Sequence, residues 1–194
     1  MENKTNYIIE EPTVTLSMHP KKFAMWLFIV TVVMIFASLT SAYIVRQAEG
    51  NWFEFQLPPI FYINSGIILL SSFTMHWAYL SAKKNNLEMV KLGVGLTTFL
   101  GLAFVVAQYF AWGELVKIDV FFVGNPSGSF LYVLTGLHAA HLISGVIFLI
   151  VVLFATFNYK VHSKNLTQIE MCTTYWHFLD GLWLYLFLFL SLNN

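Results

Sequence analysis

Residues 23–45 read FAMWLFIVTVVMIFASLTSAYIV, an apolar run that contains no charged side chain. As a helix, 23 residues extend about 35 Å, enough to cross the hydrocarbon core of a bilayer. Lys21 and Lys22 precede the run, as basic residues precede the apolar part of a signal peptide. That part is usually only about 7–15 residues long. We therefore expect residues 23–45 to be a membrane span and not a cleaved signal.

Four further apolar stretches of similar length follow the first. The five predicted spans lie at roughly 23–45, 60–82, 89–112, 130–159 and 171–192. Each stretch is far longer than the alternating segments of a transmembrane barrel, and a helix satisfies its own backbone hydrogen bonds in lipid. We expect an all-α fold, an integral membrane bundle of five transmembrane helices. Because no repeat or flexible linker interrupts the chain, 1–194 is expected to form a single membrane domain, with a polar N-terminal segment at 1–20.

The composition excludes several classes of protein. Hydrophobic residues make up 58% of the chain and charged residues 10%, whereas charged residues form about 25% of an average soluble protein. The formal net charge is zero, so the chain lacks the clustered positive charge of a nucleic-acid-binding protein. Cys172 is the only cysteine, which excludes an internal disulfide, a thiolate metal cluster and a two-cysteine copper centre.

The basic residues between the predicted spans indicate an orientation. One side of the membrane would carry Lys4, Lys21, Lys22, Lys83, Lys84, Lys91, Lys160 and Lys164. The other side would carry only Arg46 and Lys117. Because basic residues favour the cytoplasmic side, we expect the N-terminus inside and the C-terminus outside.

A small group of ionisable residues within or beside the last two spans forms the candidate site. Its members are His138, His141, Glu170, His177 and Asp180. Ionisable groups are expensive in a bilayer and therefore indicate a function or a specific partner. Three roles remain open at this point: a hydrogen-bonded network between helices, contact with phospholipid headgroups or another subunit, and ligation of a metal or haem. No nucleophile with its base is recognisable, so we expect no catalytic residue in this chain.

Small residues recur every four positions on two of the predicted helices. The first set is Gly93, Thr97 and Gly101, and the second is Gly136, Ala140 and Ser144. Such spacing lets membrane helices approach closely. We expect both sets to mediate packing within the bundle, with docking against another subunit as the alternative.

Two late motifs resemble those of a known family. Residues 135–141 read TGLHAAH, and Glu170 is followed by YWHFLD at 175–180 and WLYLF at 183–187. These motifs are similar to segments of cytochrome c oxidase subunit III, in its short five-helix bacterial form. The resemblance runs from about residue 18 to the C-terminus and includes MWLF at 25–28.

This resemblance implies a non-catalytic subunit III of a proton-pumping haem–copper terminal oxidase in aerobic respiratory electron transport. Its partners would be oxidase subunits I and II, and a larger respiratory supercomplex is compatible with it. Haems and copper would lie in the partner subunits, with no cofactor other than phospholipid in this chain. The resemblance also implies that the five candidate residues fix helix packing and a lipid pocket. It places the chain in the bacterial plasma membrane as a multi-pass protein.

The chain departs from the family at two positions. Val32 stands where the family commonly has a buried glutamate, and Ala111-Trp112 stands where it commonly has a Glu–Tyr pair. Roles that depend on those carboxylates do not transfer to this chain. Alternatives are the equivalent subunit of a quinol oxidase and the accessory protein of a nitric oxide reductase. More remote ones are a small transporter and a membrane cytochrome that uses His138 and His177.

Overall fold

The computed structural model describes residues 20–157 and 166–193, and every regular element in them is an α-helix. The five helices are α1 (Pro20–Ala48), α2 (Ile60–Lys83), α3 (Leu87–Lys117), α4 (Pro126–Phe157) and α5 (Thr167–Leu192). The all-α fold and the five helices are therefore confirmed. The polar segment predicted at 1–20 lies outside the described residues except for its last residue, as do Lys4, Lys160 and Lys164.

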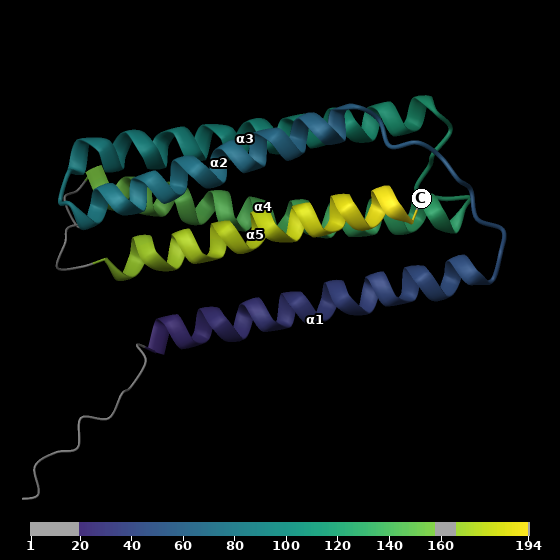
Figure 1. Cartoon of the computed structure of the whole chain (residues 1–194), viewed down its shortest axis with the longest axis horizontal. Coiled ribbons are helices and arrows are strands. Elements are labelled where there is room, and N and C mark those ends of the chain that lie inside the picture. Colours follow the sequence, from purple (N-terminus) through teal and green to yellow (C-terminus); the bar gives the residue numbers. More distant parts are fainter. Residues whose placement is uncertain (1–19, 158–165, 194) are drawn as a thin grey trace, which may run out of the picture.

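The helices lie side by side with their long axes roughly parallel (Figure 1). α2 and α3 form an antiparallel hairpin, and α4 and α5 form a second layer against it. α1 lies beyond the second layer and contacts α4 and α5 but not the α2–α3 hairpin. α5 therefore separates α1 from α2, and it contributes to most of the polar contacts between helices.

The start of α4 differs from the prediction. The sequence predicted a span from about residue 130, whereas the helix already begins at Pro126. The side-chain Oδ1 of Asn125 accepts a hydrogen bond from the backbone N–H of Ser127 at 2.9 Å. Proline suits the first turn of a helix because it lacks the N–H that would otherwise need a partner there. The residues just before the predicted span therefore form the capped first turn of the helix.

Four of the five helices are long and apolar enough to cross a membrane, namely α1, α3, α4 and α5. α2 has 24 residues, and several of its small polar side chains turn inward, including Asn64, Ser65, Ser71 and Thr74. These polar side chains reduce the average hydropathy of α2, although they lie buried between helices. Outside the bundle, large apolar side chains are exposed, such as Phe73 at 73% and Phe99 at 67%. An apolar exterior around a partly polar interior is what a bilayer environment favours.

The small residues of α3 lie at helix contacts as predicted. A Cβ atom on Gly93 would come within 2.7 Å of the Cβ of Ala78 in α2, and one on Gly101 within 2.6 Å of the Trp176 ring in α5. In the second predicted set, on α4, Ser144 lies 2.7 Å from the Tyr175 hydroxyl of α5, but the other two members do not pack in this way. A Cβ on Gly136 would meet no atom within 4 Å, and Ala140 is exposed.

Candidate functional site

Two of the candidate residues meet α2 at the middle of α5. The Nδ1 atom of His177 lies 2.6 Å from the hydroxyl oxygen of Ser72, and its ring centroid lies 6.0 Å from that of His76. Nδ1 also lies 3.9 Å from a carboxyl oxygen of Asp180, one turn further along α5. His76 is exposed and the His177 side chain is 33% exposed. We call His76, Ser72, His177 and Asp180 the α2–α5 polar patch.

Asp180 is the buried end of this patch. Its side chain is only 4% exposed, and neither carboxyl oxygen has a hydrogen-bond partner among the described residues. A buried charge or polar group without a partner is costly. The patch therefore holds one outward pair of imidazoles and one inward carboxyl group, at the centre of a candidate membrane span.

His138 lies elsewhere, in the interior of the bundle. It is fully buried, and its ring centroid lies 5.2 Å from that of Trp183 in α5 and 6.1 Å from that of Phe104 in α3. Neither ring nitrogen has a hydrogen-bond partner among the described residues. Because His138 has no exposed surface, it cannot contact a lipid headgroup from this position.

His141 follows His138 by three residues but turns toward α1. Its ring lies 5.9 Å from that of Phe36 and 6.2 Å from that of Phe28. Its Nδ1 atom lies 2.8 Å from the backbone carbonyl oxygen of Leu137 one turn earlier. The two histidines, although only three residues apart, therefore serve different helix contacts.

Glu170 links the beginning of α5 to the beginning of α1. One of its carboxylate oxygens lies 2.8 Å from the ammonium nitrogen of Lys22, and both side chains are partly exposed. Although Glu170 lies two turns before His177 on the same stripe of α5, the two residues reach opposite neighbours. Glu170 contacts α1, whereas His177 contacts α2.

The five candidate residues thus occupy four places and do not form one site. Throughout the described ranges, no group of three or more His, Cys, Asp or Glu side chains lies close enough to hold a metal ion. The arrangement favours contacts between helices over ligation of a shared ion. Of the five candidates, His177 and Asp180 are neighbours in space.

Several polar contacts were not anticipated from the sequence. Two tryptophans of α5 donate to serines of α2: Trp176 to Ser71 at 3.0 Å and Trp183 to Ser65 at 3.1 Å, between indole nitrogen and hydroxyl oxygen. Deeper between α2 and α3, the amide of Asn64 donates to that of Gln108 at 3.0 Å. The clustering of serines in residues 60–82 was the available signal. Because serine is common in membrane helices, its presence alone does not predict which side chain it contacts.

Both positions at which the chain departs from the family lie in the apolar core. Val32 is 1% exposed and Ala111 is fully buried. An apolar side chain at such a position needs no hydrogen-bond partner, whereas a carboxylate would. These positions therefore hold no buried polar side chain that would need a partner.

Comparison with known proteins agrees with the motifs. The sequence profile of the cytochrome c oxidase subunit III family matches residues 11–193. The chain is 31% identical over 176 residues to subunit 3 of the cytochrome bo(3) ubiquinol oxidase of Buchnera aphidicola subsp. Baizongia pistaciae, which covers 86% of this chain and 88% of the relative.

Two relatives named for cytochrome c oxidase are similarly close. The probable subunit 3 of Rickettsia bellii is 31% identical over 191 residues, covering 88% of this chain and 68% of the relative. Subunit 3 of Bacillus sp. (strain PS3) is 26% identical over 182 residues, covering 91% and 87% respectively. With the profile match over nearly all of its length, the chain belongs to the cytochrome c oxidase subunit III family.

Proposed function

We propose that this chain is the non-catalytic third subunit of a proton-pumping haem–copper terminal oxidase of aerobic respiration. The observation that carries the proposal is a family match that includes all five helices and both late motifs, at 135–141 and 175–180. Its task is to stabilise subunit I, with subunit II as a further partner. The haems and copper belong to those partners, and phospholipid binds to this chain.

All five helices cross the membrane in this proposal, including α2. A helix of 24 residues is about 36 Å long, and α2 lies along α3, which is itself a candidate span. Lys21, Lys22, Lys83 and Lys84 lie near one end of the bundle, and Arg46 and Lys117 near the other. This bias supports an N-terminus inside and a C-terminus outside. Because several relatives are bacterial, we place the chain in a bacterial plasma membrane.

The candidate residues have two kinds of task in this proposal. His138, His141 and Glu170 fix the packing of α4 and α5 against α3 and α1, which their ring contacts and ion pair support. The α2–α5 polar patch instead opens at the bundle surface in the middle of a candidate span. Polar side chains in that position favour a partner over lipid tails. We expect subunit I to cover His177.

The equivalent subunit of a quinol oxidase is the second candidate. The Buchnera relative, which is named as part of a ubiquinol oxidase, is as similar to this chain as the Rickettsia relative named for cytochrome c oxidase. In both candidates the electron donor binds to other subunits. The two assignments therefore predict the same role for this chain. They differ only in the partner subunit that accepts electrons from the donor.

Affinity purification of the tagged full chain from its native membrane tests the proposal. We expect it to bring down a larger subunit that carries haem, with oxygen reduction by the purified complex. The chain expressed and purified alone should show no Soret absorption. Stoichiometric haem on the isolated chain, or purification from the native membrane without any oxidase subunit, would contradict the proposal.

The variant His177→Ala tests the polar patch. We expect less of subunit I to co-purify, while the haem content per subunit I stays unchanged. Tyr109→Phe is a matched control, because Tyr109 is 71% exposed on α3. Equal recovery of subunit I with both variants would remove the polar patch from the proposed interface.

A further inference from the structure

Four of the five helices meet in one buried polar layer. On α2, Ser65 accepts a hydrogen bond from Trp183 of α5 at 3.1 Å. The neighbouring Asn64 donates to Gln108 of α3 at 3.0 Å. The Trp183 ring in turn lies 5.2 Å from the ring of His138 on α4, measured between centroids. These contacts run from α4 through α5 and α2 to α3, and all five side chains are buried.

The register of α3 against α4 places Gln108 level with His138. Phe104, one turn before Gln108, lies 6.1 Å from His138 between ring centroids. Trp112 lies one turn after Gln108, and its indole N–H donates to the hydroxyl of Thr135 at 3.1 Å. Thr135 precedes His138 by three residues. Because these contacts lie on either side of Gln108, the amide of Gln108 and the imidazole of His138 are at nearly the same depth in the bundle.

Three side chains of the layer have polar atoms without a partner among the described residues. These atoms are both ring nitrogens of His138, Oδ1 of Asn64 and Nε2 of Gln108. The pair of amides uses one N–H and one oxygen, so one amide oxygen and one amide nitrogen stay unpaired whichever way round the two amides pair. An imidazole has at least one N–H in each protonation state. Leaving such groups unpaired in a buried site is costly.

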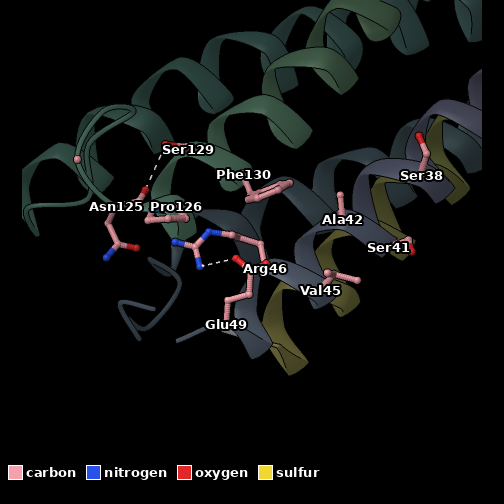
Figure 2. Close-up of a pocket in the computed structure, with 11 residues that line it drawn as sticks. Ser38, Ser41, Ala42, Val45, Arg46, Glu49, Asn125, Pro126, Ser129 and Phe130 are labelled. Carbon is pink, nitrogen blue, oxygen red and sulfur yellow. Dashed lines mark hydrogen bonds and ion pairs between the residues drawn. The ribbon is translucent and has the colours of Figure 1, made fainter. Parts of the chain in front are cut away.

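A water molecule matches this set of donors and acceptors. Buried waters typically make about three hydrogen bonds to polar groups that otherwise lack partners. The layer offers two donors, from His138 and Gln108, and one acceptor, from Asn64. It contains no carboxylate or ammonium group that would balance the charge of an ion. The layer is also separate from the cavity of about 830 Å³ between the end of α1 and the beginning of α4 (Figure 2), whose lining includes none of its residues.

We propose that the layer binds an internal water molecule that bridges His138, Gln108 and Asn64. The water accepts a hydrogen bond from a ring N–H of His138 and another from the Gln108 amide, and it donates one to the amide oxygen of Asn64. α2 and α4 do not contact each other among the described helix pairs. The water therefore connects two helices that lie diagonally across the core and fixes their relative depth.

Solid-state NMR of the full chain in lipid bilayers tests this inference. The chain is labelled with ¹³C and ¹⁵N, the His138 ring nitrogens are assigned through their backbone neighbours, and magnetisation is transferred from water protons. We expect a transfer to His138, although its side chain has no exposed surface. Absence of this transfer, or a direct hydrogen bond between His138 and either amide, would overturn the inference.

Variants within the layer locate the water. Gln108→Leu and Asn64→Leu each remove one of its partners and should reduce the transfer to His138 several-fold. Ser65→Ala is the matched control, because it removes only the acceptor of Trp183 in the same layer and should leave the transfer unchanged. Wild-type transfer in both leucine variants would show that the amides do not hold the water, and the inference would fail.

Thermal unfolding in detergent gives an independent test. His138→Phe and Gln108→Leu should each lower the unfolding midpoint. The double variant should lower it by clearly less than the sum, since both changes disrupt the same water site. The matched cycle combines His138→Phe with Thr74→Val. Thr74 is a buried polar residue of α2 whose hydroxyl lies 2.9 Å from that of Thr97, about 15 Å along the helix from Asn64.

The losses in this matched cycle should add, because Thr74 lies outside the layer. Additive losses in both cycles would overturn the inference. All groups of the water site belong to this chain, and neither experiment needs an oxidase partner. The outcome is therefore separate from that of the co-purification test.

Discussion

α1 and α5 are both long apolar helices, but they are held in the bundle by different means. Five of the 29 residues of α1 are buried, compared with twelve of the 26 residues of α5. α5 is enclosed by α2, α4 and α1, whereas among the described helices α1 contacts only α4 and α5. Packing therefore fixes α5, and α1 depends more on a few contacts at defined points.

The polar contacts of α1 are distributed along α5. Near the beginning of both helices, the Lys22 ammonium group contacts the Glu170 carboxylate. In the second half of α1, the hydroxyl groups of Thr40 and Tyr185 lie 3.0 Å apart. Near the end of α1, Tyr43 and Gln47 donate hydrogen bonds to the backbone oxygen of Asn193. Each such contact is expected to contribute about 1 kcal/mol or less.

The largest effect is expected where the core helices approach most closely. Gly101→Leu places a side chain against the buried Trp176 ring, and overpacking of this kind should lower the free energy of unfolding by about 3 kcal/mol. The matched control is Gly95→Leu on the same helix, because a Cβ there meets no atom within 4 Å. Thermal unfolding in detergent measures both. Equal midpoints for the two variants would show that α3 and α5 are not closely packed at Gly101.

An intermediate effect is expected from the tryptophan–serine contacts between α5 and α2. Ser71→Ala leaves the buried indole N–H of Trp176 without its acceptor, which should cost about 1–2 kcal/mol. Ser38→Ala is the control, because the Ser38 hydroxyl is exposed and donates only to a carbonyl of its own helix. If the double variant Ser71→Ala with Trp176→Phe shows purely additive losses, the hydrogen bond does not contribute in the expected way.

The contrast between these helices also explains what the sequence could predict. The length and apolar character of residues 23–45 predicted α1 well, because crossing a bilayer imposes a minimum length whatever the helix packs against. The helix ends were less accurate: α3 continues to Lys117, beyond the predicted residue 112. Helices can extend beyond the hydrocarbon core, and hydropathy does not report that extension.

The arrangement of the candidate residues was only partly predictable from the sequence. The cost of ionisable groups in lipid drew attention to His177 and Asp180, which lie together. It could not show that His138 and His141 face different helices, because a spacing of three residues leaves about 60° between two side chains on a helix. Whether that angle spans one neighbour or two depends on where the adjacent helices lie.

The smallest effect is expected at the ion pair between α1 and α5. Glu170→Gln removes the charge that faces Lys22, and because both side chains are partly exposed, the loss of stability should be only about 0.5 kcal/mol. Thermal unfolding will therefore change little.

The position of α1 should be more sensitive to Glu170→Gln, since a weakly packed helix shifts when one of its few attachments is lost. Spin labels at exposed positions near the beginning of α1 and on α3 would report this shift as a broader distance distribution. Exchange of the two charges, Lys22→Glu with Glu170→Lys, should restore the narrow distribution, because the pair is re-formed with opposite polarity. An unchanged distribution in Glu170→Gln would mean that packing against α4 and α5 alone positions α1, and the distinction between the two helices would then be one of degree.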